Sequence, residues 1–523
     1  MTLEELKGKT FGNVKSEEEN DTANQKLAIK IYKFTKKQIE KLVISDSDSS
    51  LVYGIITVND HKETIDLGSS MAIQWLKTLY FEENGDIHSD ETFSNILSMI
   101  AAQARQSEET ERMTIFNRIA MTTDAIYYDL CSQDWQAVKI TKNGYEVVRI
   151  NENTPIFTRK QQQLPQVLPK KEKDNALDKL IKLLRVSKSD QEIFKIHIIT
   201  FFLEKYPIPM AIVSGEHGST KSTLTKSIAR IIDPSGMNIS SIPTNTSDIA
   251  LHLNSRYISN FDNVSEISQD VSDMFCRAIT GEGYSKRKLY TDSNEIIWNY
   301  KRKILLNGIS PILEFPDFKD RSIFYETVPI SEEERMSEEE FNHRLESLMP
   351  SILHEIFTIL SYVLLMYRRI KKEIKVKLRM ADFTIFGECI SRMLKNPDLA
   401  FVEIYKKKLD SDSLKMVDSY PIVKIILEIM QDEKSLETSM GDFYKKVSEI
   451  ANANDIDTKS SEIQFPRAIN QLSRQINQLK STLRKHDLEI QIKSYESRDG
   501  KYTRGQSIIY ISKLDSGQKT ITE

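Results

Sequence analysis

Cysteine is scarce in this chain of 523 residues: Cys131, Cys276 and Cys389 are its three cysteines, and they lie far apart. This spacing excludes a disulfide framework and a cluster of cysteine metal ligands as the basis of the fold. Long apolar runs are missing too, because no signal-peptide core begins the chain and the most apolar segment, 352–366, is too short for a membrane span. We therefore expect a cytoplasmic protein with no membrane partner.

An excess of positive charge is also absent. The chain has 72 Lys and Arg against 76 Asp and Glu, a formal net charge of −4. A polyanion such as DNA must then be bound by local basic patches rather than by the overall charge. The length predicts about three or four domains, each with its own core.

The most informative motif present is GEHGSTKS at residues 215–222. It follows an apolar, β-branched run at 209–213 and precedes a helical pattern over 223–232. Strand, tight loop and helix form the context of a phosphate-binding loop, in which backbone N–H groups and a helix N-terminus face the phosphates of ATP. We expect Lys221 to reach the β and γ phosphates and Ser222 to bind Mg²⁺. The candidate nucleotide-binding residues are Gly215, Glu216, His217, Gly218, Ser219, Thr220, Lys221, Ser222 and Thr223.

One position of this loop departs from the usual pattern of Gly, four residues, Gly-Lys-Ser/Thr. Thr220 stands where the second glycine is usual, and an additional glycine, Gly218, lies inside the loop. Since glycine tolerates positive φ, Thr220 must either accept a negative φ or tolerate strain. The alternative interpretation is an ordinary glycine- and serine-rich turn with an incidental lysine.

An acidic strand end follows the loop by about 40 residues, as nucleotide hydrolysis requires. The stretch YISNFDN at 257–263 places Asp262 where a carboxylate holds Mg²⁺. Asn263 occupies the position at which many ATPases carry a glutamate base. An amide cannot accept a proton, so Asn263 cannot be the general base. Either Asp262 or Glu266 must act as the base, or Asn263 must act by orienting the attacking water. Taken alone, the stretch also fits a strand followed by an Asx turn.

Asn307 and Arg321 complete the candidate catalytic set. Asn307 is near the end of the apolar strand 303–308 and is suited to sense the γ-phosphate and orient water. Arg321 could reach a nucleotide across a subunit boundary, where its guanidinium stabilises transition-state charge, although a solvated surface arginine is the alternative. The candidate catalytic residues are Lys221, Asp262, Asn263, Asn307 and Arg321; the candidate metal ligands are Ser222 and Asp262; the expected cofactors are ATP and Mg²⁺.

Two basic segments are candidates for DNA binding. In 280–298, two β-prone pieces surround a turn, and basic residues alternate with tyrosines that can stack on bases. Over 465–504, nine Lys/Arg stand against four Asp/Glu, in the order helix, then two β segments, of a winged helix-turn-helix. Solvated charged surfaces are the alternative for both. The candidate DNA-binding residues are Lys286, Arg287, Lys288, Tyr290, Arg467, Arg474, Arg484, Lys485, Arg498, Lys501 and Arg504.

Composition and periodicity also divide the chain into domains. The predicted segments are a mobile arm (1–27), a mixed α/β N-terminal domain (28–160), a linker (161–174), an ATPase domain (175–330), a helical subdomain (331–410) and a winged-helix-like module (415–513). An Asn-Gly pair at 143–144 predicts a hairpin, and separate helices are predicted over 338–348 and 351–369. The N-terminal domain has no convincing Asp-x-Asp pair, so no primase activity is inferred.

Together these motifs resemble the primase-associated helicases of viruses, phages and plasmids, near the superfamily 3 branch of AAA+ ATPases. The similar stretches are GEHGSTKST, ISNFDN, ITGEGYSKRKLYTD, ILLNGI, DRSI and RMADFTIFGE, the last at 379–388. The resemblance implies an α/β fold with an AAA+ P-loop core, and a ring, expected to be a hexamer, that hydrolyses ATP at subunit interfaces and pulls DNA through central hairpins. It makes Asn307 the sensor and Arg321 the finger given to a neighbouring subunit.

The sequence thus predicts an ATP hydrolase of the DNA helicase or translocase type, acting in replication of a mobile genetic element. The expected partners are single-stranded DNA in the ring, duplex DNA at the C-terminal module, further copies of the chain and a separate primase. One alternative is a replication initiator or regulator that uses ATP only as an assembly switch. A second is a P-loop kinase of a small metabolite, which is disfavoured because a kinase needs neither the basic hairpin nor the Asn307 and Arg321 elements.

Overall fold

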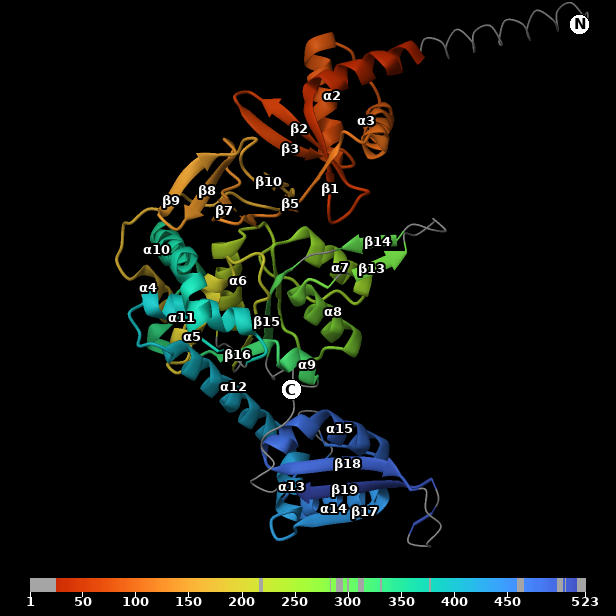
Figure 1. Cartoon of the computed structure of the whole chain (residues 1–523), viewed down its shortest axis with the longest axis vertical. Helices are drawn as coiled ribbons and strands as arrows, with labels where there is room; N and C mark the ends of the chain where they lie inside the picture. Colours follow the sequence, from red (N-terminus) through yellow and green to blue (C-terminus); the bar gives the residue numbers. More distant parts are fainter. Residues whose placement is uncertain are drawn as a thin grey trace, which may run out of the picture.

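The computed structural model describes residues 25–215, 220–282, 284–287, 295–298, 301–308, 315–329, 332–375, 378–458, 465–495, 502–503 and 505–514. An N-terminal unit, a central unit and a C-terminal unit follow one another along the long axis of the molecule (Figure 1). The predicted arm 1–27 lies almost wholly outside the described residues, since the description begins within a helix at residue 25.

The N-terminal unit, residues 25–113, is a four-stranded sheet packed against helices. Its elements are a helix over 25–38, β1 (Ile39–Ser45), β2 (Val52–Val58), β3 (His61–Asp66), α2 (Ser70–Asn84), α3 (Asp90–Gln106) and β4 (Glu111–Met113). The strand order is β3-β2-β1-β4, antiparallel except for the β1–β4 pair. Ser69 and Ser89 cap the two long helices by accepting a backbone N–H, and the unit has a hydrophobic core of its own.

A short β-rich segment joins this unit to the centre. Its strands are β5 (Ile115–Phe116), β6 (Ile119–Met121), β7 (Ala125–Asp129), β8 (Gln136–Thr141), β9 (Gly144–Arg149) and β10 (Ile156–Phe157). Strands β6 to β9 form an antiparallel meander, which confirms the hairpin predicted at 143–144. Alternate residues face opposite ways: Ile126 and Tyr128 enter the large central core, whereas Ala125 and Tyr127 enter a small separate one. The meander therefore packs on the central unit.

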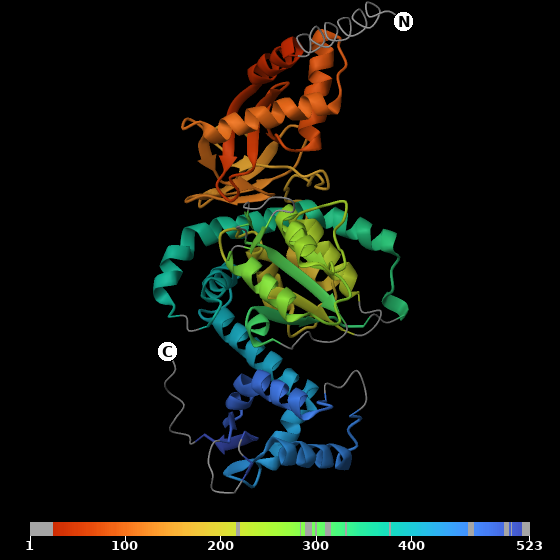
Figure 2. The same cartoon turned by 90° about the vertical axis from the view of Figure 1, so that its right-hand side faces the viewer.

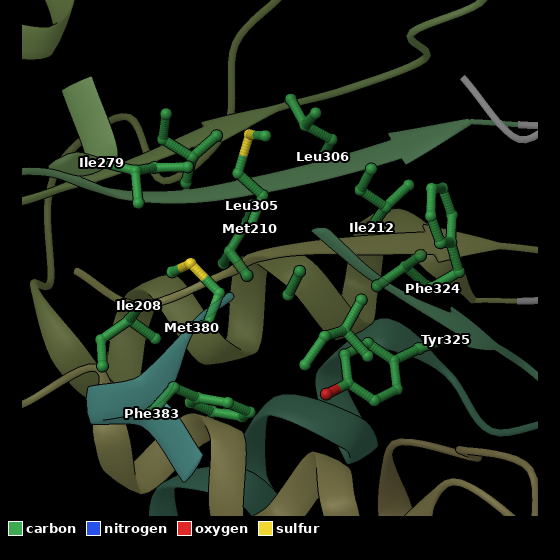
Figure 3. Packing of buried hydrophobic residues seen from close by; sticks show 14 of the residues in the cluster. Ile208, Met210, Ile212, Ile279, Leu305, Leu306, Phe324, Tyr325, Met380 and Phe383 are labelled. Carbon is green, nitrogen blue, oxygen red and sulfur yellow. The ribbon is translucent and has the colours of Figure 1, made fainter. Parts of the chain in front are cut away.

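The central unit is built on a parallel sheet with the order β12-β15-β11-β16. Its strands are β11 (Met210–Ser214), β12 (Ile258–Phe261), β15 (Lys303–Gly308) and β16 (Ser322–Glu326). Its helices and its short 3-10 turn are α4 (Ala176–Leu183), α5 (Gln191–Thr200), α6 (Lys221–Ile232), α7 (Thr246–Ser255), α8 (Gln269–Thr280), α9 (Pro316–Lys319) and η1 (Glu332–Glu334). The strands are buried almost throughout, as helices on both faces of a parallel sheet require. Met210, Leu305 and Phe324 of three neighbouring strands lie in one cluster with Phe383 (Figure 3).

A long helix, α10 (Glu338–Glu373), crosses the central unit on the side that faces the N-terminal unit (Figure 2). It contains Pro350, so the prediction of two separate helices was wrong. Its residues 345, 348, 349, 352 and 353 are all buried, and this burial on both sides of the proline offsets the roughly 3 kcal/mol that an internal proline costs. Among the described residues, α10 alone is long and apolar enough to cross a membrane, but 61% of that window is buried inside the protein, as in a core helix.

Helices α11 (Ala381–Met393) and α12 (Ala400–Ser419) follow, and α12 leads to the C-terminal unit (Figure 1). This unit consists of α13 (Pro421–Ile429), β17 (Ser435–Ser439), α14 (Met440–Ala453), α15 (Ile469–Lys485), β18 (Leu488–Ser494) and β19 (Ser507–Lys513). Its antiparallel sheet has the order β17-β19-β18. The chain as a whole is therefore a mixed α/β protein with several sheets.

Candidate nucleotide-binding site

The carboxyl edge of the central sheet gathers the candidate residues. Val213 is paired with Asn307, and Phe261 is paired with Leu306, so the ends of three strands lie side by side. The loop after β11, Asn307 near the end of β15 and Asp262 immediately after β12 therefore meet at one edge. In an open parallel sheet, this edge is where ligands bind.

Ser222 and Asp262 are in direct contact at this edge. The Ser222 hydroxyl donates a hydrogen bond of 2.7 Å to Asp262 Oδ1. A hydroxyl beside a carboxylate is an oxygen pair that suits Mg²⁺, which binds to one or two protein oxygens and takes its other ligands from phosphates and water. No group of three or more His, Cys, Asp or Glu side chains that could hold a metal occurs in the described part of the chain.

Lys221, the first residue of α6, donates from Nζ to the carbonyl oxygen of Gly215 at 2.7 Å. Burial lowers the pKa of this ammonium group, while the negative charge of Asp262 acts in the opposite direction. The hydrogen bond thus joins the first residue of the loop, Gly215, to the first residue of α6. Glu216, His217, Gly218 and Ser219, which the sequence assigned to the same loop, lie outside the described residues.

Thr220 has a positive φ of 62°, in the left-handed region, as the residue that precedes α6. Of the two possibilities that the sequence left open, the structure adopts the strained one. A left-handed conformation costs a non-glycine residue about 1–2 kcal/mol. The backbone therefore follows the course that glycine usually allows, and the threonine side chain is accommodated at that cost.

Asn307 is fully buried and is bonded at both ends of its amide group. Its Nδ2 donates to Thr225 Oγ1 of α6 at 2.9 Å, and its Oδ1 accepts the backbone N–H of Asn263 at 3.1 Å. The next residue, Gly308, lies so close to Val264 that an added Cβ would be 2.2 Å from the Val264 oxygen. Asn307 thus ties the helix after the loop to the turn after Asp262. Thr225 was missed in the sequence because a threonine inside a helix carries no signal of its own.

A cavity of about 390 Å³ opens beside the start of α6. It is lined by Thr220 and Thr223 on one side, by Arg185 after α4, and by Phe341 and Asn342 near the start of α10. An aromatic ring with amide and hydroxyl groups around it has the character of a small-molecule site. None of these lining residues outside the loop was predicted, because α4 and α10 reach the loop only in the folded chain.

Arg321 lies at the opposite edge of the sheet. It immediately precedes β16, whose first residue pairs with Met210 at the start of β11, whereas the loop follows the end of that strand. Its guanidinium pairs with Asp317, which also pairs with Arg379, and Arg379 contacts Asp320 at 3.0 Å. Burial alone would raise the pKa of Asp317, but the two arginines outweigh it and lower the pKa. Arg379 had no role in the sequence prediction.

The predicted basic hairpin is confirmed as a hairpin: β13 (Tyr284–Arg287) pairs antiparallel with β14 (Glu295–Trp298). It stands away from the central unit beside α7 (Figure 1). Lys286 and Arg287 lie on β13, and Lys288 and Tyr290 lie outside the described residues.

On α15, Leu472, Ile476, Leu479 and Leu483 form the buried face, and Ile469 is 42% exposed. Arg467, Arg474 and Arg484 are exposed, the last of them 3.8 Å from Glu489. Lys485 is the last residue of α15, and Arg498, Lys501 and Arg504 fall outside the described residues. One face of α15 is therefore apolar and buried, and its other face exposes Arg474 and Arg484 to solvent.

Two stretches of the chain match known protein families. Residues 177–412 match the family described as actinomycete integrative conjugative element replication protein, and residues 422–520 match the AICE RepA C-terminal domain. No curated protein matches the chain.

Solved structures give only a weak likeness. The A form apo structure of the NrS-1 C terminal region is 13% identical, with 92% of this chain and 98% of that chain covered and a TM-score of 0.39. A second structure, of NrS-1 residues 305–718, is 14% identical, with 91% and 98% covered and a TM-score of 0.38.

Proposed function

Because residues 177–412 and 422–520 belong to a family of mobile-element replication proteins, we propose that this chain is an ATP-dependent DNA helicase or translocase that acts in such replication. The observation that carries the proposal is the contact of Ser222 with Asp262 at the sheet edge where the loop, Asp262 and Asn307 meet. This is the arrangement that an AAA+ P-loop ATPase needs to hold Mg²⁺ and a triphosphate.

The proposed ligand is ATP, because of the charge at the start of α6 and the cavity beside it. The N-terminal end of α6 and the Lys221 ammonium group would face the phosphates, because the positive end of a helix dipole attracts anions. The Ser222 hydroxyl and the Asp262 carboxylate would hold Mg²⁺, which neutralises phosphate charge when it is bound. The cavity lined by Thr223, Phe341 and Asn342 would take the base.

Asn307 supports hydrolysis in this proposal by fixing geometry. One N–H of its amide is used on Thr225 and one lone pair on Asn263, so a second N–H and a second lone pair remain for a water molecule. Asp262 is held by Ser222, and the backbone of Asn263 is held by Asn307, so both would have fixed positions beside such a water. Asp262 would then bind Mg²⁺. Asn263 would orient the attacking water, since its amide cannot accept a proton.

Arg321 would act on the nucleotide of a neighbouring subunit. The five-residue strand β11 separates its edge of the sheet from the loop, a length of about 13–16 Å at 3.3 Å per residue. No arginine side chain spans that path around a packed sheet to its own site. A ring of identical subunits, in which each subunit supplies Arg321 to the nucleotide site of its neighbour, would place this guanidinium beside a nucleotide.

The C-terminal unit would bind duplex DNA as a winged helix. Its order α13, β17, α14, α15, β18, β19 puts the exposed Arg474 and Arg484 on the helix that precedes the strand pair. Such a helix lies in the major groove in helix-turn-helix proteins, with arginines on base edges and phosphates.

Lys221→Ala tests the proposal directly. We expect ATP hydrolysis to fall at least about 100-fold because an electrostatic contact to the phosphates is lost. The thermal unfolding temperature should stay unchanged, and Lys406→Ala, an exposed lysine on α12, is the matched control. Hydrolysis that survives in Lys221→Ala would show that the loop is wrongly assigned.

The same assay separates the alternatives. Turnover that single-stranded DNA stimulates supports the motor. Tight ATP binding without turnover supports the initiator, and a phosphorylated small product supports the kinase.

A further inference from the structure

We infer that a second site, for a nucleoside phosphate unit, lies between the N-terminal unit and the central unit. A cavity of about 570 Å³ opens there, a size typical of small-molecule sites, which measure about 300–1,000 Å³. Its walls come from β1, β2, the segment around β5 and the edge of the central unit that is remote from the ATP loop. It is therefore distinct from the site proposed above.

Four cationic side chains line this cavity, three of them from the central unit. The four are Lys160, Lys205, Lys301 and Arg302, and they outnumber the two acidic residues of the wall, Asp46 and Glu204. Lys301 donates to the carbonyl oxygen of Lys205 at 2.7 Å, and Arg302 donates to the carbonyl oxygens of Leu253 and Asn254, so both are held in place. Fixed cations in a cleft are what a phosphate group requires.

Two buried acceptors in the same wall have no hydrogen-bond partner among the described residues: Asn117 Oδ1 and Glu204 Oε2. A buried oxygen without a donor costs about 1–3 kcal/mol, so a ligand that supplies N–H or O–H groups gains that energy. Burial raises the pKa of Glu204, although four cations nearby oppose the shift. A base edge or a sugar hydroxyl supplies the donors that these two oxygens lack.

Part of the cavity wall is apolar and would contact the face of a nucleotide base. Leu51, Tyr53, Phe116 and Tyr257 line the cavity beside the polar groups. Cations, unpaired acceptors and aromatic rings in one cavity match the phosphate, the base edge and the base face of a single nucleotide. The shared chemistry is a nucleoside phosphate, either as part of a DNA strand or as a free nucleotide.

The position of the cavity favours a DNA strand. Gly281, just before β13, and Lys301, just after β14, both line it, so the cavity lies at the foot of the β13–β14 hairpin. The Lys301 side chain lies across Gly281 so closely that an added Cβ would be 2.7 Å from its Cε. If the hairpin contacts DNA, as in the proposed function, the next nucleotides of that strand meet these cations.

The double variant Lys160→Ala/Lys205→Ala tests the site. Both side chains are at least partly exposed, so the fold should survive, and Lys406→Ala/Lys407→Ala on α12 removes two exposed lysines elsewhere. Binding of a fluorescein-labelled single-stranded oligonucleotide should weaken roughly five- to tenfold, and the slope of log affinity against log salt should fall by about 0.7 for each lost phosphate contact. Basal ATP hydrolysis should stay unchanged, which separates this site from the ATP loop.

Binding of deoxyadenosine monophosphate, measured in parallel, identifies the source of the ligand. Loss of oligonucleotide affinity assigns the cavity to a strand, and loss of mononucleotide affinity alone assigns it to a free nucleotide. Unchanged affinity for both probes, with an unchanged melting temperature, would overturn the site.

Photocrosslinking gives a second measurement that needs no variant. An oligonucleotide that carries 5-iodouracil should form adducts within the peptides that contain Tyr53 or Phe116. Adducts confined to other peptides would contradict the inference.

Discussion

The Ser222 hydroxyl donates a 2.7 Å hydrogen bond to Asp262, a residue 40 positions later in the chain. The bond joins the first turn of α6 to the end of β12, two elements on which the proposed ATP site depends. In the proposed function, this hydroxyl and this carboxylate would hold the cation that accompanies the phosphates.

Removing the negative charge of Asp262 should weaken the binding of Mg²⁺ without unfolding the protein. We expect Asp262→Asn to raise the Mg²⁺ concentration needed for half-maximal hydrolysis and to lower turnover at least about 100-fold, because the amide cannot neutralise the metal. A magnesium titration of steady-state ATP hydrolysis measures both. Asp270→Asn on the exposed start of α8 is the control, and equal magnesium curves for the two variants would argue against a metal role of Asp262.

Thr220→Gly should stabilise the protein. Thr220 has φ of 62°, which glycine adopts freely, and the relief of about 1–2 kcal/mol exceeds the roughly 0.5–1 kcal/mol that glycine loses through its more flexible unfolded state. Thr223→Gly, three residues on in the right-handed helix α6, should instead destabilise by a few tenths of a kcal/mol, roughly the difference in helix propensity between threonine and glycine. Denaturant unfolding of both variants without nucleotide measures the difference. A loss of stability in both would mean that the Thr220 side chain makes contacts worth more than the strain.

Arg321→Ala and Lys221→Ala should complement each other in mixed oligomers. Arg321 precedes β16 at the edge of the sheet opposite the loop, so each variant alone should be inactive, while random mixing restores about a quarter of the interfaces. Steady-state hydrolysis of the mixture measures this. A mixture of Lys221→Ala with Asp262→Asn is the control, because both changes affect the same edge of one subunit. Equal activity in the two mixtures would place Arg321 outside a shared site.

Stability should fall as the pH drops below about 6.5, and His197 should account for part of the loss. This imidazole is buried, its Nε2 donates to the Pro209 oxygen at 2.9 Å, and its Nδ1 accepts from the Tyr325 hydroxyl at 2.7 Å. Burial lowers the pKa of His197 to about 3, so the folded state keeps it neutral while the unfolded chain takes up a proton below pH 6.5. The contribution is therefore complete above pH 6.5 and is lost as the pH falls towards 3.

At pH 5 this linkage amounts to about 2 kcal/mol. Urea unfolding of the parent and of His197→Gln at pH 7 and pH 5 should show a smaller pH difference in the variant, even if the variant is less stable throughout. His343→Gln, at an exposed position of α10, should keep the parent's pH difference. The same pH difference in His197→Gln and the parent would contradict the assignment.

Local patterns sufficed for the elements that carry the proposed site. The apolar run at 209–213 and the helical pattern at 223–232 correspond to β11 and α6, and the β segments in 280–298 correspond to the β13–β14 hairpin. Each of these is set by neighbours in the chain: β-branched residues between glycine and proline, or apolar residues at helical spacing. Pro350 was misjudged because its local penalty is visible in the sequence, whereas the burial that offsets it is not.

The sequence by itself determined the chemistry that is available: a loop with Lys221 and Ser222, a carboxylate at a strand end, and the pattern of a mixed α/β protein. Only the tertiary structure decided which of these groups meet. The strand order placed Asn307 beside the loop and Arg321 at the far edge, and it brought Arg379 to Asp317 over 62 positions. Periodicity and turn residues act over a few positions, but contacts between distant segments depend on how whole faces pack, and that information lies in no single stretch of the chain.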